Sequence, residues 1–251
     1  MNLIKKITQI INDDNYLYSF EREILNKALK HVIYNNPSNN LPYHNLNHTL
    51  FKLICSFNIY INSEYIDFCV SDFDYCHKHC NNTYDSSEQV SLFVLLLSDL
   101  LHDYAHTGGI ETDDINIQIA KDNFIEFIKP FETILNEIGC FNKLITGVCN
   151  VLDATQYPYV KQNLTEIDKM SRDSDLMSVL QENWFTQIII GLHTEINTSL
   201  TKQGKSPISL KDHIINQMRF FLSITFYTEY ANKICYPKIK DAIKMLEIIR
   251  S

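Results

Sequence analysis

The sequence predicts an all-α, compact multi-helix fold. Glycine and proline number only six each among 251 residues, and this scarcity favours long helices over a turn-rich β architecture. Hydrophobic residues make up 45% of the chain, enough for a sizeable core, and they recur at helical spacing through most segments. The length, together with the lack of any repeat or linker, predicts a single domain over residues 1–251.

Helices are expected wherever the helical spacing of apolar residues continues, with breaks where Asn, Gly, Pro or Ser accumulate. Ser87 is a candidate N-cap for a helix that is apolar nearly all round and is therefore expected to be buried. Thr112-Asp113-Asp114 indicates another helix start, just after a break at Thr107-Gly108-Gly109. The expected helical segments are 3–35 before an Asn-rich loop, 43–61, 87–101, 112–128, 131–153, 163–182, 184–202, 210–234 and 238–250, with Pro237 dividing the last two.

Charge and hydropathy disfavour several classes of function. The net charge of −8 argues against a surface for polymeric nucleic acid. The N-terminal residues lack the apolar core of a signal peptide, and the longest apolar run ends at Ser98, so no membrane span is expected. Seven scattered cysteines favour reduced thiols and a cytoplasmic location. Nothing in the sequence indicates the oligomeric state.

Two short polar stretches carry the residues that point to chemistry. In the first, His44 and His48 stand four residues apart, so on a helix they share one face. In the second, His102 and Asp103 end the expected buried helix, where a polar pair costs folding free energy unless a partner or a metal ion satisfies it. His106 follows His102 by four residues. Imidazoles and carboxylates in this arrangement predict a site for a divalent cation.

A downstream carboxylate is expected to complete the site. Asp175 is the preferred candidate, and Asp173 is its rival. Asn45 occupies the place where a His-Glu-x-x-His metalloprotease needs its glutamate, which disfavours that class. A lone buried histidine is more often a hydrogen-bonded core residue than a ligand, so the prediction depends on all these groups together. A separate segment, Cys76-His77-x-His79-Cys80, has the residue types of zinc ligands, although a solvated loop is the simpler interpretation.

These motifs resemble those of the HD-domain metal-dependent phosphohydrolases, and within them the catalytic domain of class I cyclic-nucleotide phosphodiesterases. Four blocks carry the resemblance, and they follow the family's order over about 43–221. The blocks are Tyr43-His44-Asn45-x-x-His48, similar to Tyr-His-Asn-x-x-His; Leu101-His102-Asp103-x-x-His106-x-Gly108, similar to His-Asp-x-x-His-x-Gly; Ser174-Asp175-Leu176-x-Ser178, similar to Ala-Asp-Leu-Ser; and Asn216-Gln217-Met218-Arg219-Phe220, similar to Ser-Gln-x-x-Phe.

The resemblance implies two divalent metal ions as cofactors, drawn from Zn, Mn, Mg or Fe, and a small nucleotide as substrate. The implied reaction is hydrolysis of a 3′,5′-cyclic nucleotide, or a related cyclic oligonucleotide, by a hydroxide that bridges the two ions. The implied roles are as follows: His48, His102, Asp103 and Asp175 as metal ligands, His44 as general acid, His106 orienting waters of the second ion, and Tyr43, Gln217 and Phe220 at the substrate.

The chain also departs from the family pattern. After His48 the family's Ala-x-Asp-Val is replaced by Thr49-Leu50-Phe51-Lys52, and the family's Leu-Glu pair has no counterpart. Glu111, Asp113 or Asp114, near Asn116, are candidates to replace that pair. Two other functions stay open, an HD-type nucleotidase or deoxynucleoside triphosphate phosphohydrolase, and a catalytically inactive nucleotide-binding sensor. The retained general acid and Gln217 favour the cyclic diester, and the intact ligand set argues against the sensor.

Overall fold

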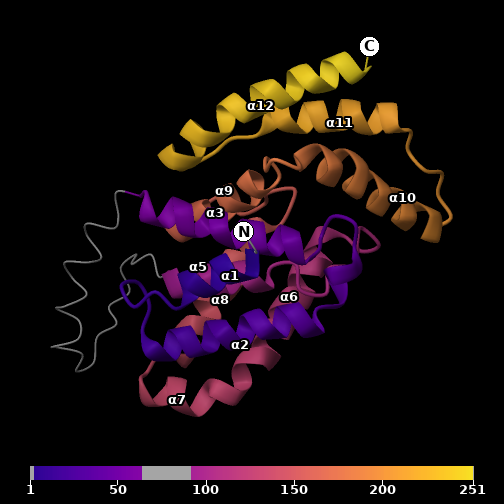
Figure 1. The fold of residues 1–251 in the computed structure, drawn as a ribbon. Coiled ribbons are helices and arrows are strands. Elements are labelled where there is room, and N and C mark those ends of the chain that lie inside the picture. The colour runs from indigo at the N-terminus through magenta and orange to yellow at the C-terminus, as the bar shows by residue number, and fades with distance from the viewer. Residues whose placement is uncertain (1–2, 64–91, 251) are drawn as a thin grey trace.

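The computed structural model describes residues 3–63 and 92–250, and every regular element in those ranges is a helix (Figure 1). This confirms the predicted all-α class. The α-helices are α1 (Leu3–Ile11), α2 (Ser19–Asn35), α3 (Leu46–Ile61), α5 (Leu92–Leu101), α6 (Asp113–Ile128), α7 (Glu132–Glu137), α8 (Phe141–Thr155), α9 (Glu166–Ser178), α10 (His193–Lys202), α11 (Leu210–Ser223) and α12 (Glu229–Arg250). Two 3-10 turns, η1 (Pro37–Asn40) and η2 (Lys129–Phe131), and a π-helix, η3 (Phe185–Leu192), complete the set.

Helix α3 joins two hydrophobic cores. Its residues Leu50 and Leu53 belong to a core shared with α1, α2, α5, α6 and α8. Its residues Cys55 and Ile59 belong to a second core, shared with α9, η3, α11 and α12. In Figure 1, α10, α11 and α12 form an outer layer on one side of the remaining helices. Because α3 packs against both α5 and α9, the histidine- and aspartate-bearing segments of these three helices meet where the cores join.

The start of α3 differs from the prediction. The side chain of Asn45 caps the helix by accepting hydrogen bonds from the backbone N–H groups of Asn47, at 2.9 Å, and His48, at 3.4 Å. The helix therefore begins at Leu46, not near Tyr43. The expectation that His44 and His48 share a helical face is wrong, because His44 lies in the non-helical segment before the cap.

The second half contains two further corrections. Pro237 lies inside α12 instead of dividing two helices, and it does so on the exposed side of the helix, where the carbonyl that proline leaves unpaired is not forced into the core. The break falls earlier, between Ser223 and Glu229. The expected helix 131–153 is interrupted at Gly139, whose φ of 70° ends α7 and lets the chain restart as α8.

Other boundaries agree with the sequence. The break at Thr107-Gly108-Gly109 is confirmed, with φ of 67° and 79° at the two glycines. The predicted helix start at Thr112-Asp113-Asp114 is confirmed, since α6 begins at Asp113, although the side chain of Thr112 makes no capping hydrogen bond. Ser87 and the Cys76–Cys80 segment lie outside the described residues, and the single domain over 1–251 stays a prediction.

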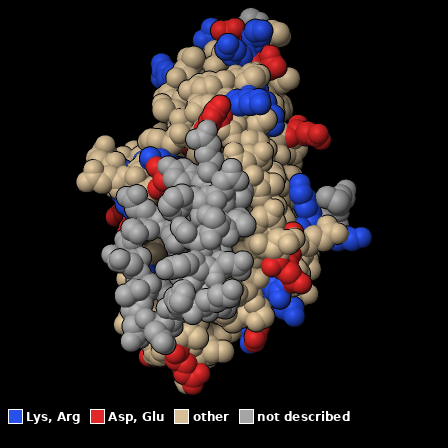
Figure 2. Space-filling view, turned by 90° about the vertical axis from the view of Figure 1, so that its left-hand side faces the viewer, with Lys and Arg blue, Asp and Glu red and all other residues tan. Residues whose placement is uncertain are grey.

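The surface adds two observations. Over the part of the chain that the structure describes, no helix combines the length and hydropathy that a membrane crossing requires. Figure 2 shows basic and acidic side chains interspersed over the described part of one face, without one sign dominating.

Candidate metal centre

Side chains from three helical segments meet here: His48, His102 and Asp175 place ligand atoms within 4.8 Å of one another, and Asp103 lies against both histidines. His48 comes from α3, His102 and Asp103 lie at the end of α5, and Asp175 comes from α9. His48 Nε2 is 3.2 Å from Asp103 Oδ2 and 3.2 Å from Asp175 Oδ1. His102 Nε2 is 3.0 Å and 3.5 Å from the same two oxygens. Adjacent ligands of an ion with bonds of about 2.1 Å lie about 3 Å apart in octahedral geometry, so the spacing suits a divalent cation.

Buried atoms without partners support the same fit. His102 Nε2, Asp103 Oδ2 and Asp175 Oδ1 are buried, and no described residue hydrogen-bonds any of them. Burying such groups unpaired costs folding free energy, which a bound cation offsets. His102 Nδ1 lies 3.0 Å from the backbone carbonyl of Asp99, which only accepts, so Nδ1 donates and Nε2 faces the cluster. His48 Nδ1 is likewise held, 3.3 Å from Ser178 Oγ.

The electrostatics keep both aspartates ionised. Burial alone raises the pKa of Asp103, but the neighbouring His102 and His48 outweigh it and hold that pKa well below its usual range. Burial alone also raises the pKa of Asp175, but Lys52 and His102 outweigh this effect and hold that pKa well below its usual range. Burial lowers the pKa of His102, yet Asp103 raises it to about 9.

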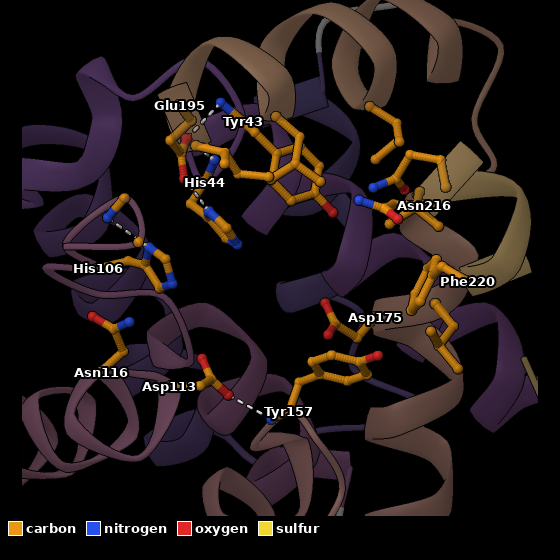
Figure 3. A pocket seen from close by; sticks show the side chains of 18 of the residues that line it. Tyr43, His44, His106, Asp113, Asn116, Tyr157, Asp175, Glu195, Asn216 and Phe220 are labelled. Carbon is orange, nitrogen blue, oxygen red and sulfur yellow. Dashed lines mark hydrogen bonds and ion pairs between the residues drawn. The ribbon is translucent and has the colours of Figure 1, made fainter. Parts of the chain in front are cut away.

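A second group, beside the first, surrounds His44. The Nδ1 atom of His44 hydrogen-bonds Glu195 Oε1, and Glu195 Oε2 accepts from the backbone N–H groups of Tyr43, at 3.0 Å, and His44, at 3.1 Å. Burial lowers the pKa of His44, but Glu195 and the nearby aspartates raise it overall. Figure 3 shows the His44 ring directed into the cavity, with Glu195 behind it.

Glu195 is a residue that sequence reasoning missed. It lies on α10, 151 residues beyond His44 in the chain, and no motif connects the two. Close packing of the backbone at Gly191 against Pro42 brings Glu195 and His44 together. The packing is so close that a Cβ atom on Gly191 would lie only 2.8 Å from the backbone oxygen of Pro42. The π-helix that contains Gly191 thus lies directly against the segment that carries His44.

His106 stacks on His44, with ring centroids 3.7 Å apart. The backbone N–H of Gly108 donates to His106 Nδ1 at 3.0 Å, so Nε2 carries the ring proton. Burial, together with His44, lowers the pKa of His106 to about 3, so this ring is neutral near pH 7. The chain turns back between Asp103 and His106 through Ala105, whose φ is 59°.

A cavity of about 480 Å³ opens beside these groups (Figure 3). The residues expected at a substrate, Tyr43, Gln217 and Phe220, all line it. Tyr157 adds an aromatic ring, 6.0 Å from that of Phe220 between centroids. The acidic lining residues are Glu111, Asp113, Asp175 and Glu195, and among the described residues no lysine or arginine lines the cavity.

The other acidic residues considered for the site lie in different places in the structure. Asp173, the rival of Asp175, faces away from the cluster and accepts hydrogen bonds from the backbone N–H groups of Tyr227 and Thr228. Asp114 lines a separate surface depression, whereas Glu111 and Asp113 line the cavity. Asn116 supports the loop after His106, since its Oδ1 accepts from Thr107 N at 3.1 Å.

No family model matches this chain, and no curated protein matches it. The resemblance to the HD-domain phosphohydrolases therefore stays a prediction, and the metal centre is inferred from the geometry described above. Four donors, three of them with unpaired buried atoms, lie next to a cavity into which a hydrogen-bonded imidazole points, an arrangement that suits metal-assisted hydrolysis with a general acid.

Proposed function

We propose that the protein is a metal-dependent phosphodiesterase that hydrolyses a 3′,5′-cyclic nucleotide or a related cyclic oligonucleotide. The observation that carries the proposal is the convergence of His48, His102, Asp103 and Asp175 beside the cavity that His44 enters. Divalent ions held by these four residues would activate water as a nucleophile at neutral pH and would neutralise charge on the phosphoryl oxygens.

The histidines of the cavity divide the proton chemistry between them. His44, protonated and held by Glu195, donates its Nε2 proton to the sugar oxygen that leaves phosphorus. Glu195 acts through His44 by fixing the orientation of its ring. His106 is neutral, and its Nε2–H is available to hydrogen-bond a water or a phosphoryl oxygen on the same side of the cavity.

The far wall of the cavity suits a nucleobase. Gln217 offers an amide that both donates and accepts hydrogen bonds, and Asn216 beside it offers a second. The rings of Phe220 and Tyr157 present apolar surface to a planar base.

The charge of the lining favours a cyclic diester over the nucleotidase alternative. Phosphate groups of nucleoside mono- and triphosphates are usually held by arginine or lysine. No described lysine or arginine lines this cavity, and four carboxylates do. A cyclic phosphodiester carries a single negative charge per phosphate, so it is the substrate class that the lining repels least.

The test is to incubate the Mn²⁺-loaded protein with cyclic mono- and dinucleotides and with ordinary nucleotides, and to identify products by chromatography. We expect ring opening of at least one cyclic phosphodiester. Release of orthophosphate from a monophosphate, or of triphosphate from a nucleoside triphosphate, would support the nucleotidase instead, and binding without product would support the sensor.

Two variants connect the activity to the cluster. Asp103→Ala is expected to abolish Mn²⁺ binding and activity while the helical circular dichroism persists. Asp114→Ala is the matched control, because Asp114 lies outside the cavity, and it is expected to behave as wild type.

A further inference from the structure

A second layer of buried polar side chains lies one helical turn beyond the metal ligands. Most of its members are spaced four residues from a ligand on the same helical segment, which places them on the same face. All are completely buried, at 0% exposure, so the layer is sealed from water. The layer consists of Lys52 and Ser56 on α3, Asp99 on α5 and Ser171 on α9.

The layer is organised around Asp99. Its two carboxylate oxygens accept hydrogen bonds from Ser56 Oγ and, at 2.6 Å, from Ser171 Oγ. Lys52 Nζ lies 3.5 Å from Asp99 Oδ1 and 3.9 Å from Asp175 Oδ1. No described residue hydrogen-bonds this Nζ atom, so its surroundings are set by the two carboxylates. The ammonium thus lies between Asp99 of this layer and Asp175 of the metal centre.

Two physical effects of this ammonium oppose each other. Without a metal, it is the one positive side chain within ion-pair distance of Asp99 among the described residues, and removing a counter-charge from a buried carboxylate is strongly destabilising. With a metal, the ammonium shares Asp175 with a divalent cation and repels it across a short distance in a buried site.

We propose that Lys52 is a resident cation of the metal centre. Its ammonium on α3 pairs with Asp99 on α5 and with the ligand Asp175 on α9, so it holds these three helices together when no metal is bound, and it weakens the binding of the metal that shares Asp175. This inference rests on the metal centre of the proposed function, and it does not depend on which substrate is hydrolysed. Lys52 is a positioning residue, because it acts through Asp175 and does not face the cavity.

The test compares Lys52→Met with the wild type after removal of metal by a chelator. Mn²⁺ affinity is measured by titration calorimetry, and Tm is measured with and without Mn²⁺. We expect the Kd for Mn²⁺ to fall at least about tenfold in the variant, because the repulsion is removed. We also expect a lower Tm without metal and a larger gain in Tm on adding Mn²⁺ than in the wild type.

A lysine with a purely structural role would lower Tm and leave the Mn²⁺ affinity unchanged or weaker. Lys121→Met is the matched control, since Lys121 pairs with Asp153 on the α6–α8 side, away from the cluster. Its Kd for Mn²⁺ is expected to equal that of the wild type.

A second variant covers the case in which Lys52→Met does not fold without metal. Lys52→Met/Asp99→Asn removes both charges of the pair, so it is expected to fold and still to bind Mn²⁺ more tightly than the wild type. An unchanged or weaker affinity in a folded variant would overturn the inference, as would failure of the double variant to fold even with Mn²⁺. If the wild type itself takes up no Mn²⁺, the metal centre fails, and both proposals fail with it.

Discussion

The substitution Glu195→Gln tests how the protein prepares His44 as an acid. Glu195 contacts the His44 segment through the ring Nδ1 and through the backbone N–H groups of Tyr43 and His44. Glutamine retains an oxygen that accepts from the backbone, so the segment is expected to stay in place. The substitution removes the negative charge that pairs with the imidazolium.

The expected magnitude follows from that pairing. A hydrogen bond to a charged group contributes about 1.5–3 kcal/mol, and about 1.4 kcal/mol corresponds to a tenfold change in rate. We therefore expect kcat for the cyclic nucleotide to fall roughly 10- to 100-fold. Glu195 also helps to raise the pKa of His44 against the effect of burial. Removing the charge lowers that pKa, so the alkaline limb of the kcat profile, where His44 loses its proton, moves to lower pH.

Two substrates make the assay specific for the acid. A cyclic nucleotide expels a basic sugar alkoxide that needs a proton, whereas bis(4-nitrophenyl) phosphate expels a weakly basic phenolate that does not. Glu195→Gln should slow the first reaction and leave the second nearly unchanged. Glu23→Gln, which removes an exposed carboxylate paired with Lys27, controls for the loss of one negative charge. Equal losses on both substrates, or an alkaline limb that does not move, would refute this role of Glu195.

Three further predictions concern packing, stability and the substrate. Gly191→Ala places a Cβ atom about 2.8 Å from the backbone oxygen of Pro42 and should lower kcat at least about tenfold; Gly147→Ala meets only a side chain at 3.4 Å and should not. Burial raises the pKa of Glu21 to about 7, so its protonated form stabilises the fold at acidic pH and this contribution is lost as pH rises through about 7. Glu21→Gln should therefore raise the free energy of unfolding by about 2 kcal/mol at pH 8 and by much less at pH 5, as urea titrations would show; equal gains at both pH values would contradict this. Gln217→Ala should raise KM for the nucleotide roughly tenfold with little change in kcat, and unchanged kinetics would remove Gln217 from the substrate site.

Local signals in the sequence predicted most of the fold. Scarce glycine and helical spacing gave the correct class, and the two glycines after the His-Asp pair marked a real break. Pro237 was misinterpreted because a proline on an exposed helix face is tolerated, and exposure is not visible in a local pattern. The start of α3 was misplaced because Asn45 serves as the N-cap, its side chain accepting hydrogen bonds from the first backbone N–H groups of the helix, and the apolar spacing alone does not mark that position.

Long-range contacts limited the prediction of the site. The ligand cluster was predicted because His48, His102, Asp103 and Asp175 stand in recognisable motifs, and the structure does bring them together. Glu195 has no such motif, and only tertiary packing reveals its contact with His44.

Lys52 is a second residue whose role could not be predicted from the sequence. The sequence showed that the residues after His48 depart from the family pattern, but the departure had no interpretation. Burial and the 3.5 Å approach to Asp99 give it one.

The most direct test of the metal centre is the anomalous difference density of crystals grown with Mn²⁺. The geometry predicts a peak at roughly 2.0–2.3 Å from His48 Nε2, His102 Nε2, Asp103 Oδ2 and Asp175 Oδ1 together. A peak elsewhere, or none at this cluster in Mn²⁺-saturated crystals, would contradict the account.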